Sequence, residues 1–106
     1  MRDLKFNVKG QSLKKDLKCN FNNIVAGSSN YYNAVFSMSE DWEGFTCVAL
    51  FESGNKKSYM PIINGHCMIP DTVLHGKEYY ISLIGVKNKT KITTNKVRVG
   101  QIVNGG

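Results

Sequence analysis

The sequence lacks any apolar run long enough to cross a membrane. Its longest runs, residues 48–51 and 81–86, fall far short of the roughly 20 residues that a bilayer-spanning helix needs. Residues 1–6 alternate charged and apolar side chains, whereas a signal peptide has a continuous apolar centre. We therefore expect a chain that is made in the cytoplasm and has no membrane partner.

Residues suited to catalysis or metal binding are also scarce. The chain has two histidines, His66 and His75, and three cysteines, Cys19, Cys47 and Cys67. No cysteine stands in the C-x-x-C spacing that is typical of zinc and redox sites. His66 and Cys67 are neighbours, but neighbours on a strand point to opposite faces and cannot act together as base and nucleophile. We expect reduced cysteines, no metal, no cofactor and no enzyme activity.

Acidic residues are few, because eight Asp and Glu stand against fourteen Lys and Arg, giving a net charge of +6. Lysines concentrate in residues 1–18 and 87–98, while three acids cluster within residues 40–43. This separation predicts opposite signs on separate faces and docking to a charged partner. The predicted partner-binding residues are Glu40, Asp41, Trp42 and Glu43 in the acidic turn, and the lysines Lys14, Lys15, Lys18, Lys87, Lys89 and Lys91.

The acidic turn has several interpretations. The alternating spacing of a calcium-binding loop is absent, and consecutive carboxylates diverge too much to form a glycosidase pair. A solvated turn, or a turn that docks to a basic patch on another subunit, remains. Trp42 either caps the core, which we favour, or forms the nucleus of an exposed aromatic platform for carbohydrate.

Alternation of polar and apolar residues predicts strands along most of the chain. Asn64 and Gly65 predict a two-residue hairpin turn inside a meander, and residues 71–75 predict one helical turn. Residues 46–51 are nearly all apolar, as in a strand buried on both faces. Strands are expected over residues 4–9, 32–38, 46–51, 57–63, 66–69, 79–86 and 92–103, with a lysine-protected edge strand within 12–19.

These patterns predict an all-β fold, an antiparallel β-sandwich of seven or eight strands. The length of 106 residues suits one core, so we expect a single domain over residues 1–103 and a flexible end over 104–106. A small barrel is the alternative, because counting strands does not distinguish a closed sheet from two packed sheets.

Nucleic-acid binding is a competing hypothesis, since β-barrels hold single strands with basic and aromatic side chains. The tyrosines, however, fall in strand patterns that explain them as core or sheet-face residues, and no glycine-rich or RNP-like signature accompanies them. A nucleic-acid partner is therefore not expected.

Four segments, in this order, carry a resemblance to a known group of proteins. Residues 36–45 read Phe-Ser-Met-Ser-Glu-Asp-Trp-Glu-Gly-Phe, residues 49–51 Ala-Leu-Phe, residues 67–70 Cys-Met-Ile-Pro, and residues 93–100 Thr-Thr-Asn-Lys-Val-Arg-Val-Gly. The pattern resembles small virion domains of phages and prophages from Firmicutes, found as head-fibre, capsid-decoration or baseplate-type proteins. It covers about residues 32–103.

The resemblance implies an immunoglobulin-like sandwich without enzyme activity, made in the host bacterial cytoplasm and located in the virion. Its partners would be capsid or other virion proteins, bound in many copies or as a homo-oligomer. In related chains a fibre often follows the closing strand, whereas this sequence stops at Gly106, which favours capsid decoration over a fibre. A baseplate or tail adaptor is the alternative. A basic module suits an acidic capsid lattice, where many weak contacts add up.

Overall fold

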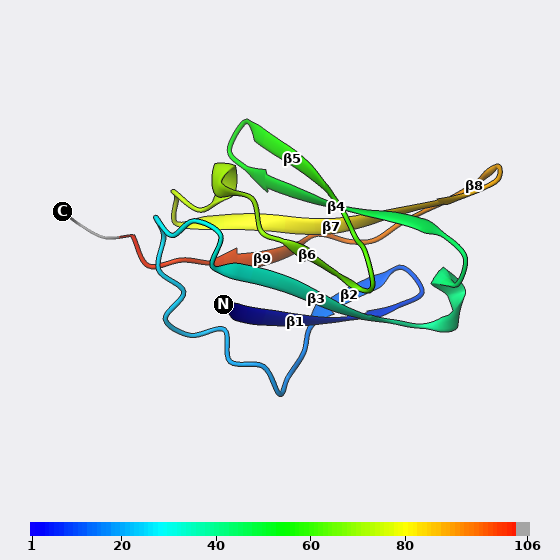
Figure 1. Cartoon of the computed structure of the whole chain (residues 1–106), viewed down its shortest axis with the longest axis horizontal. Coiled ribbons are helices and arrows are strands. Elements are labelled where there is room, and N and C mark those ends of the chain that lie inside the picture. Colours follow the sequence, from blue (N-terminus) through cyan, green and yellow to red (C-terminus); the bar gives the residue numbers. More distant parts are fainter. Residues whose placement is uncertain (104–106) are drawn as a thin grey trace.

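Two β-sheets packed face to face form the body of the computed structural model, which describes residues 1–103 (Figure 1). The flexible end predicted for residues 104–106 lies outside the described residues. The strands are β1 (Arg2–Lys9), β2 (Ser12–Lys15), β3 (Tyr32–Met38), β4 (Thr46–Ser53), β5 (Lys56–Pro61), β6 (His66–Met68), β7 (Glu78–Lys87), β8 (Thr90–Thr93) and β9 (Val97–Gly100). Two short 3-10 helices, η1 (Glu40–Trp42) and η2 (Asp71–Val73), join them, the second within the helical turn predicted near 71–75.

The four-stranded sheet has the order β2-β1-β3-β6. β2 pairs antiparallel with β1 and lies at the edge, as predicted for the lysine-rich segment. β1 and β3 run parallel, with Leu4 beside Ala34 and Val8 beside Met38, so an entirely antiparallel sandwich is wrong for this pair. Parallel neighbours need a long return connection, which residues 16–31 supply.

Arg2 organises that return loop. Its guanidinium donates hydrogen bonds to the carbonyl oxygens of Asn20, Asn22 and Asn23 at 2.9, 2.6 and 3.1 Å. The planar guanidinium of Arg2 thus holds the loop against the start of β1. The loop leads into β3, whose first residue, Tyr32, pairs with Arg2.

The five-stranded sheet has the order β5-β4-β7-β8, and β9 pairs with β7. Residues 84–87 of β7 pair with β8 and residues 78–81 pair with β9, so the strand predicted over 92–103 is split into two. Pro61 lies on the edge strand β5, where a residue without an amide N–H is tolerated, as predicted.

The Asn64–Gly65 turn forms as predicted, with positive φ of 54° and 79°. The meander expected around it is wrong. After a single bridge between Ile63 and His66, the chain leaves the five-stranded sheet and β6 pairs with β3. The turn therefore joins the two sheets and closes one side of the sandwich, and it brings Cys67 into the core beside Ala34.

The core is one cluster that lies between the sheets. Strand alternation supplies it, as in β1, where Leu4, Phe6 and Val8 point inward. The two-sided burial expected for residues 46–51 is wrong, because only alternate residues of β4 are buried and Val48 and Leu50 are half-buried. The outer face of this sheet is open.

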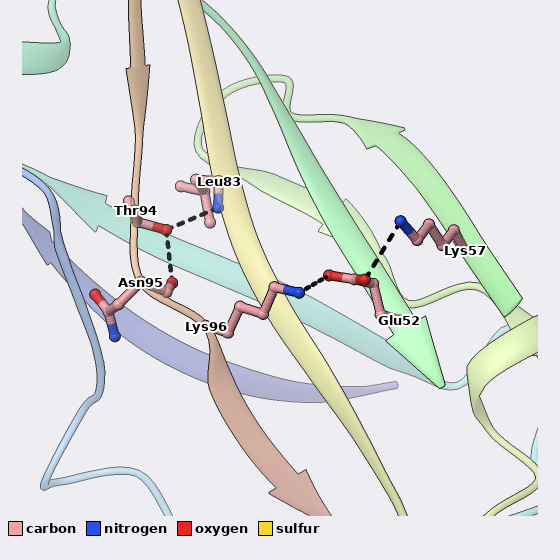
Figure 2. Close-up of polar contacts among 6 residues, drawn as sticks. All are labelled: Glu52, Lys57, Leu83, Thr94, Asn95 and Lys96. Carbon is pink, nitrogen blue, oxygen red and sulfur yellow. Dashed lines mark hydrogen bonds and ion pairs between the residues drawn. The ribbon is translucent and has the colours of Figure 1, made fainter. Parts of the chain in front are cut away.

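A break between β8 and β9 closes the other side of the sandwich (Figure 2). The Thr94 hydroxyl accepts a hydrogen bond from the Leu83 N–H and donates one to the Asn95 carbonyl, both at 2.9 Å. Asn95 then turns toward the other sheet. Its Oδ1 accepts from the backbone N–H of Leu13 at 2.7 Å, and its Nδ2 donates to the Leu13 carbonyl at 3.0 Å. The Asn95 side chain thereby satisfies the two backbone groups of Leu13 on the side of the edge strand β2 that has no neighbouring strand.

Replacing Asn95 with alanine should destabilise the fold by about 1–3 kcal/mol, because both backbone groups of Leu13 lose a partner in a partly buried setting. Urea unfolding measures this. Asn7→Ala is the control, since Asn7 is exposed and its side chain makes no hydrogen bond within residues 1–103. Equal unfolding free energies for the two variants would contradict the bridging role.

Candidate docking surfaces

Trp42, which was predicted to bind a partner, is a core residue. It is 3% exposed, and its Nε1 donates a hydrogen bond to the Gly10 carbonyl at 2.8 Å. Its ring packs against Gly85, where an added Cβ would lie 2.7 Å from Cζ3. The core-capping interpretation is confirmed, and a buried ring cannot serve as the exposed platform that carbohydrate binding requires.

The acidic residues around Trp42 remain on the surface. Glu40, Asp41 and Glu43 are all exposed. The Ser39 hydroxyl accepts the Gly10 N–H at 3.1 Å and donates to Asp41 Oδ2 at 3.2 Å, so Asp41 helps to hold the turn. Their role in partner binding stays a prediction.

Three of the predicted lysines lie in the β7–β8 hairpin. They are Lys87, Lys89 and Lys91, all exposed. This hairpin and the acidic turn lie at the same end of the molecule (Figure 1). Lys87 Nζ is 5.8 Å from the centre of the Phe45 ring, and Lys91 shares a shallow hollow with Asp41. The expectation of opposite signs on separate faces is wrong here, because folding brings these lysines beside the acids.

The lysines of the β2 region do not share one surface. Lys14 is exposed, whereas Lys15 is half-buried on the opposite side of the strand, with Nζ 5.1 Å from the centre of the Phe21 ring. Burial, together with the nearby charge of Arg98, lowers the pKa of Lys15. Lys18 lies in the loop beyond, exposed, and its backbone N–H donates to Asp16.

The outer face of the four-stranded sheet is polar and basic. Alternation along β1 and β2 points Lys5, Lys9 and Lys14 outward. Asn7 pairs with Lys14 on one side and with Ser37 on the other, which keeps this surface hydrophilic across three strands. We call Lys5, Lys9 and Lys14 the basic face.

The outer face of the five-stranded sheet is apolar, and sequence reasoning missed it. The apolar run 46–51, which forms most of β4, predicts a strand buried on both sides. The sequence does carry a signal for an open face. It predicts only one short helical turn, and so no helix long enough to cover the outer face of a sheet. We call this surface the apolar face, and it consists of Val48, Leu50, Tyr59, Pro61, Ile84 and Val86.

Charged residues lie at the border of the apolar face. Glu52 Oε1 is 2.9 Å from Lys96 Nζ, and Glu52 Oε2 is 3.7 Å from Lys57 Nζ (Figure 2). The Lys96 ammonium reaches Glu52 by crossing β7, and it lowers the pKa of that carboxyl. Arg98 Nε lies 2.6 Å from Glu78 Oε1, which lowers the pKa of Glu78.

Reactive groups are separated by the fold. Cys67 is buried while its neighbour His66 is exposed, which confirms that the two point to opposite faces of β6. Burial raises the pKa of the Cys67 thiol to about 12. Within residues 1–103, no three His, Cys, Asp or Glu side chains gather closely enough to hold a metal ion. The same residues contain no helix long and apolar enough to span a membrane.

Comparison of the chain with protein-family models, with curated proteins and with solved structures found no match.

Gly85→Ala should destabilise the protein by about 1–3 kcal/mol, because the new methyl group would overlap the buried Trp42 ring. Denaturant unfolding followed by tryptophan fluorescence measures the loss. Gly76→Ala is the matched control, since its Cβ would meet only ordinary contacts, the nearest at 3.5 Å. An unchanged Gly85→Ala midpoint would refute close packing at this end.

Glu52→Gln tests the ion pair with Lys96. Lys96 lowers the pKa of Glu52 in the folded state. The ion pair therefore stabilises the fold at pH values above the unfolded pKa of about 4.3. This stabilisation is lost as pH falls through the pKa that Glu52 has in the folded protein. The variant should be less stable than wild type at pH 7 by up to about 1 kcal/mol. The difference should shrink as pH falls below the unfolded pKa of about 4.3, whereas replacement of the exposed Glu40 by Gln should have little effect on stability. A gap that stays constant with pH would argue against the pairing.

Proposed function

We propose that this chain is a structural protein of a phage virion, a capsid-decoration or head-fibre-type module of immunoglobulin-like type that binds the particle surface. A baseplate or tail adaptor is the other location within the same proposal. Its work would then lie in surface contacts, and it would carry out no reaction.

The observation that supports this proposal most is the distribution of positive charge. The net charge is +6, and lysines are exposed on the outer side of both sheets. Two of the carboxylates, Glu52 and Glu78, are already paired with cations. The remaining positive field would draw the module to an acidic lattice, where many copies make weak individual contacts sufficient.

The segments that carry the resemblance also have identifiable structural tasks. The Ser-Glu-Asp-Trp turn places Trp42 over Gly85 at one end of the sandwich. The Thr-Thr-Asn segment forms the break that lets Asn95 bind β2. Two of the four segments therefore serve to close the sandwich in this chain.

The proposal predicts that the chain co-purifies with particles of the phage or prophage that encodes it. Particles purified on a density gradient would be separated into capsid and tail fractions and probed with an antibody against the chain. We expect the chain in the capsid fraction, and its release should increase as salt rises toward about 1 M, where surface charges are screened within about 3 Å.

Recovery in the tail fraction would instead identify an adaptor. Absence of the chain from both fractions would refute a virion role.

A further inference from the structure

We infer that the apolar face is the docking surface of this protein, and that its partner is an acidic protein surface with an apolar centre. The inference rests on the proposed function only for the setting, a virion. The face itself is a property of the fold.

The register of the five-stranded sheet gathers the apolar side chains into adjacent rows. Val48 lies between Pro61 on β5 and Ile84 on β7, so these three form one row. Leu50 and Tyr59 pair in the next row. Side chains on alternate positions of neighbouring strands share one face, so the two rows lie side by side. Ser82 on β7, which pairs with Leu50, is the polar member of the second row.

The edges of this face are open to solvent, where Tyr59, Pro61 and Val86 are exposed, whereas Val48, Leu50 and Ile84 at its centre are half-buried. Tyr59 is 59% exposed and Val86 is 47% exposed. Single exposed apolar residues are ordinary, but a contiguous group on one sheet is typical of an interaction site. Tyrosine is a common source of binding energy in such surfaces, and Tyr59 lies on the edge strand β5 beside Leu50.

The charges around the face select the partner. Four cations, Lys57, Lys91, Lys96 and Arg98, border it, against the two carboxylates Glu52 and Glu78. A second copy docked face to face would bring this net positive border against itself, since the same patch contributes from both sides of a two-fold interface. Complementarity favours carboxylates on the partner instead.

A nucleic acid fits this surface less well. Single strands bind by stacking bases on aromatic rings along a basic groove. Here aliphatic side chains such as Val48, Leu50 and Ile84 occupy the centre, and the carboxylate of Glu52 lies at the border, where it would repel a phosphate. We therefore assign a protein, and not a nucleic acid, as the partner of the apolar face.

The first test uses defined probes and needs no particle. Two synthetic peptides share the same apolar residues, and carry either Glu or Lys at every polar position; an oligo(dT) strand is the third probe. Amide shifts of the full chain are followed by NMR during titration. We expect the Glu peptide alone to bind, and to shift outward residues of β4, β5 and β7.

The second test compares two substitutions of exposed apolar residues by aspartate. Tyr59→Asp should weaken binding of the Glu peptide about tenfold or more. Leu17→Asp should leave it unchanged, because Leu17 is fully exposed and lies outside the apolar face, in a hollow beside Lys9 and Lys14 of the basic face. The unfolding midpoint of each variant shows whether it folds, and the titration of the wild-type chain is informative without either variant.

Several results would overturn the inference. These are shifts on Lys5, Lys9 and Lys14, equal binding of both peptides, binding of oligo(dT) at this face, or self-association of the free chain that protects Tyr59. On purified particles, hydroxyl-radical footprinting should show protection of Tyr59. A chain that is absent from particles but binds the Glu peptide through this face refutes the virion role alone, whereas a particle-bound chain with an exposed Tyr59 refutes the docking face alone.

Discussion

The two hydrogen bonds between the Asn95 side chain and the Leu13 backbone are the interaction on which the closed sandwich depends. β2 is an edge strand, and its unpaired backbone groups would otherwise face the gap between the sheets. Asn95 reaches them only because the strand breaks after β8, where Thr94 takes over the hydrogen bond to Leu83. The same break turns Lys96 outward to Glu52. The break between β8 and β9 therefore accounts both for the closure of the core by Asn95 and for the Lys96–Glu52 ion pair on the outer surface.

The far end of the sandwich is closed by a different contact. Trp42 fills the space above Gly85 and binds the carbonyl of Gly10, so one ring ties the η1 turn to β7 and to the β1–β2 turn. Burying the ring leaves only the acidic side chains of this turn outside. The turn is thus structural at its centre, and any docking role belongs to its carboxylates.

Much of this fold could be predicted from local sequence patterns, because strand alternation and turns depend on residues that are neighbours in the chain. The alternation in β1 and β3, the turn at Asn64 and Gly65, and the capping role of Trp42 all followed from the sequence. Pairing partners did not, because alternation fixes which side of a strand is buried and not which strand lies next to it. The parallel β1–β3 pair and the transfer of β6 to the other sheet are decided by long-range packing. For the same reason, the apolar face was mistaken for buried strand, and the predicted lysines proved to be spread over several surfaces.

The neighbouring edge strand determines how the apolar face can be used. An exposed edge next to an apolar sheet invites strand addition. Here η2 packs against β5, with Ser58 and Thr72 hydroxyl oxygens 2.6 Å apart, and Lys56 and Lys57 begin that strand. Strand addition at β5 is thus discouraged, while the face itself stays open. Recognition would then depend on side-chain shape and on charge at the border, so a partner is selected by its surface rather than by the general capacity of any extended chain to pair with an edge.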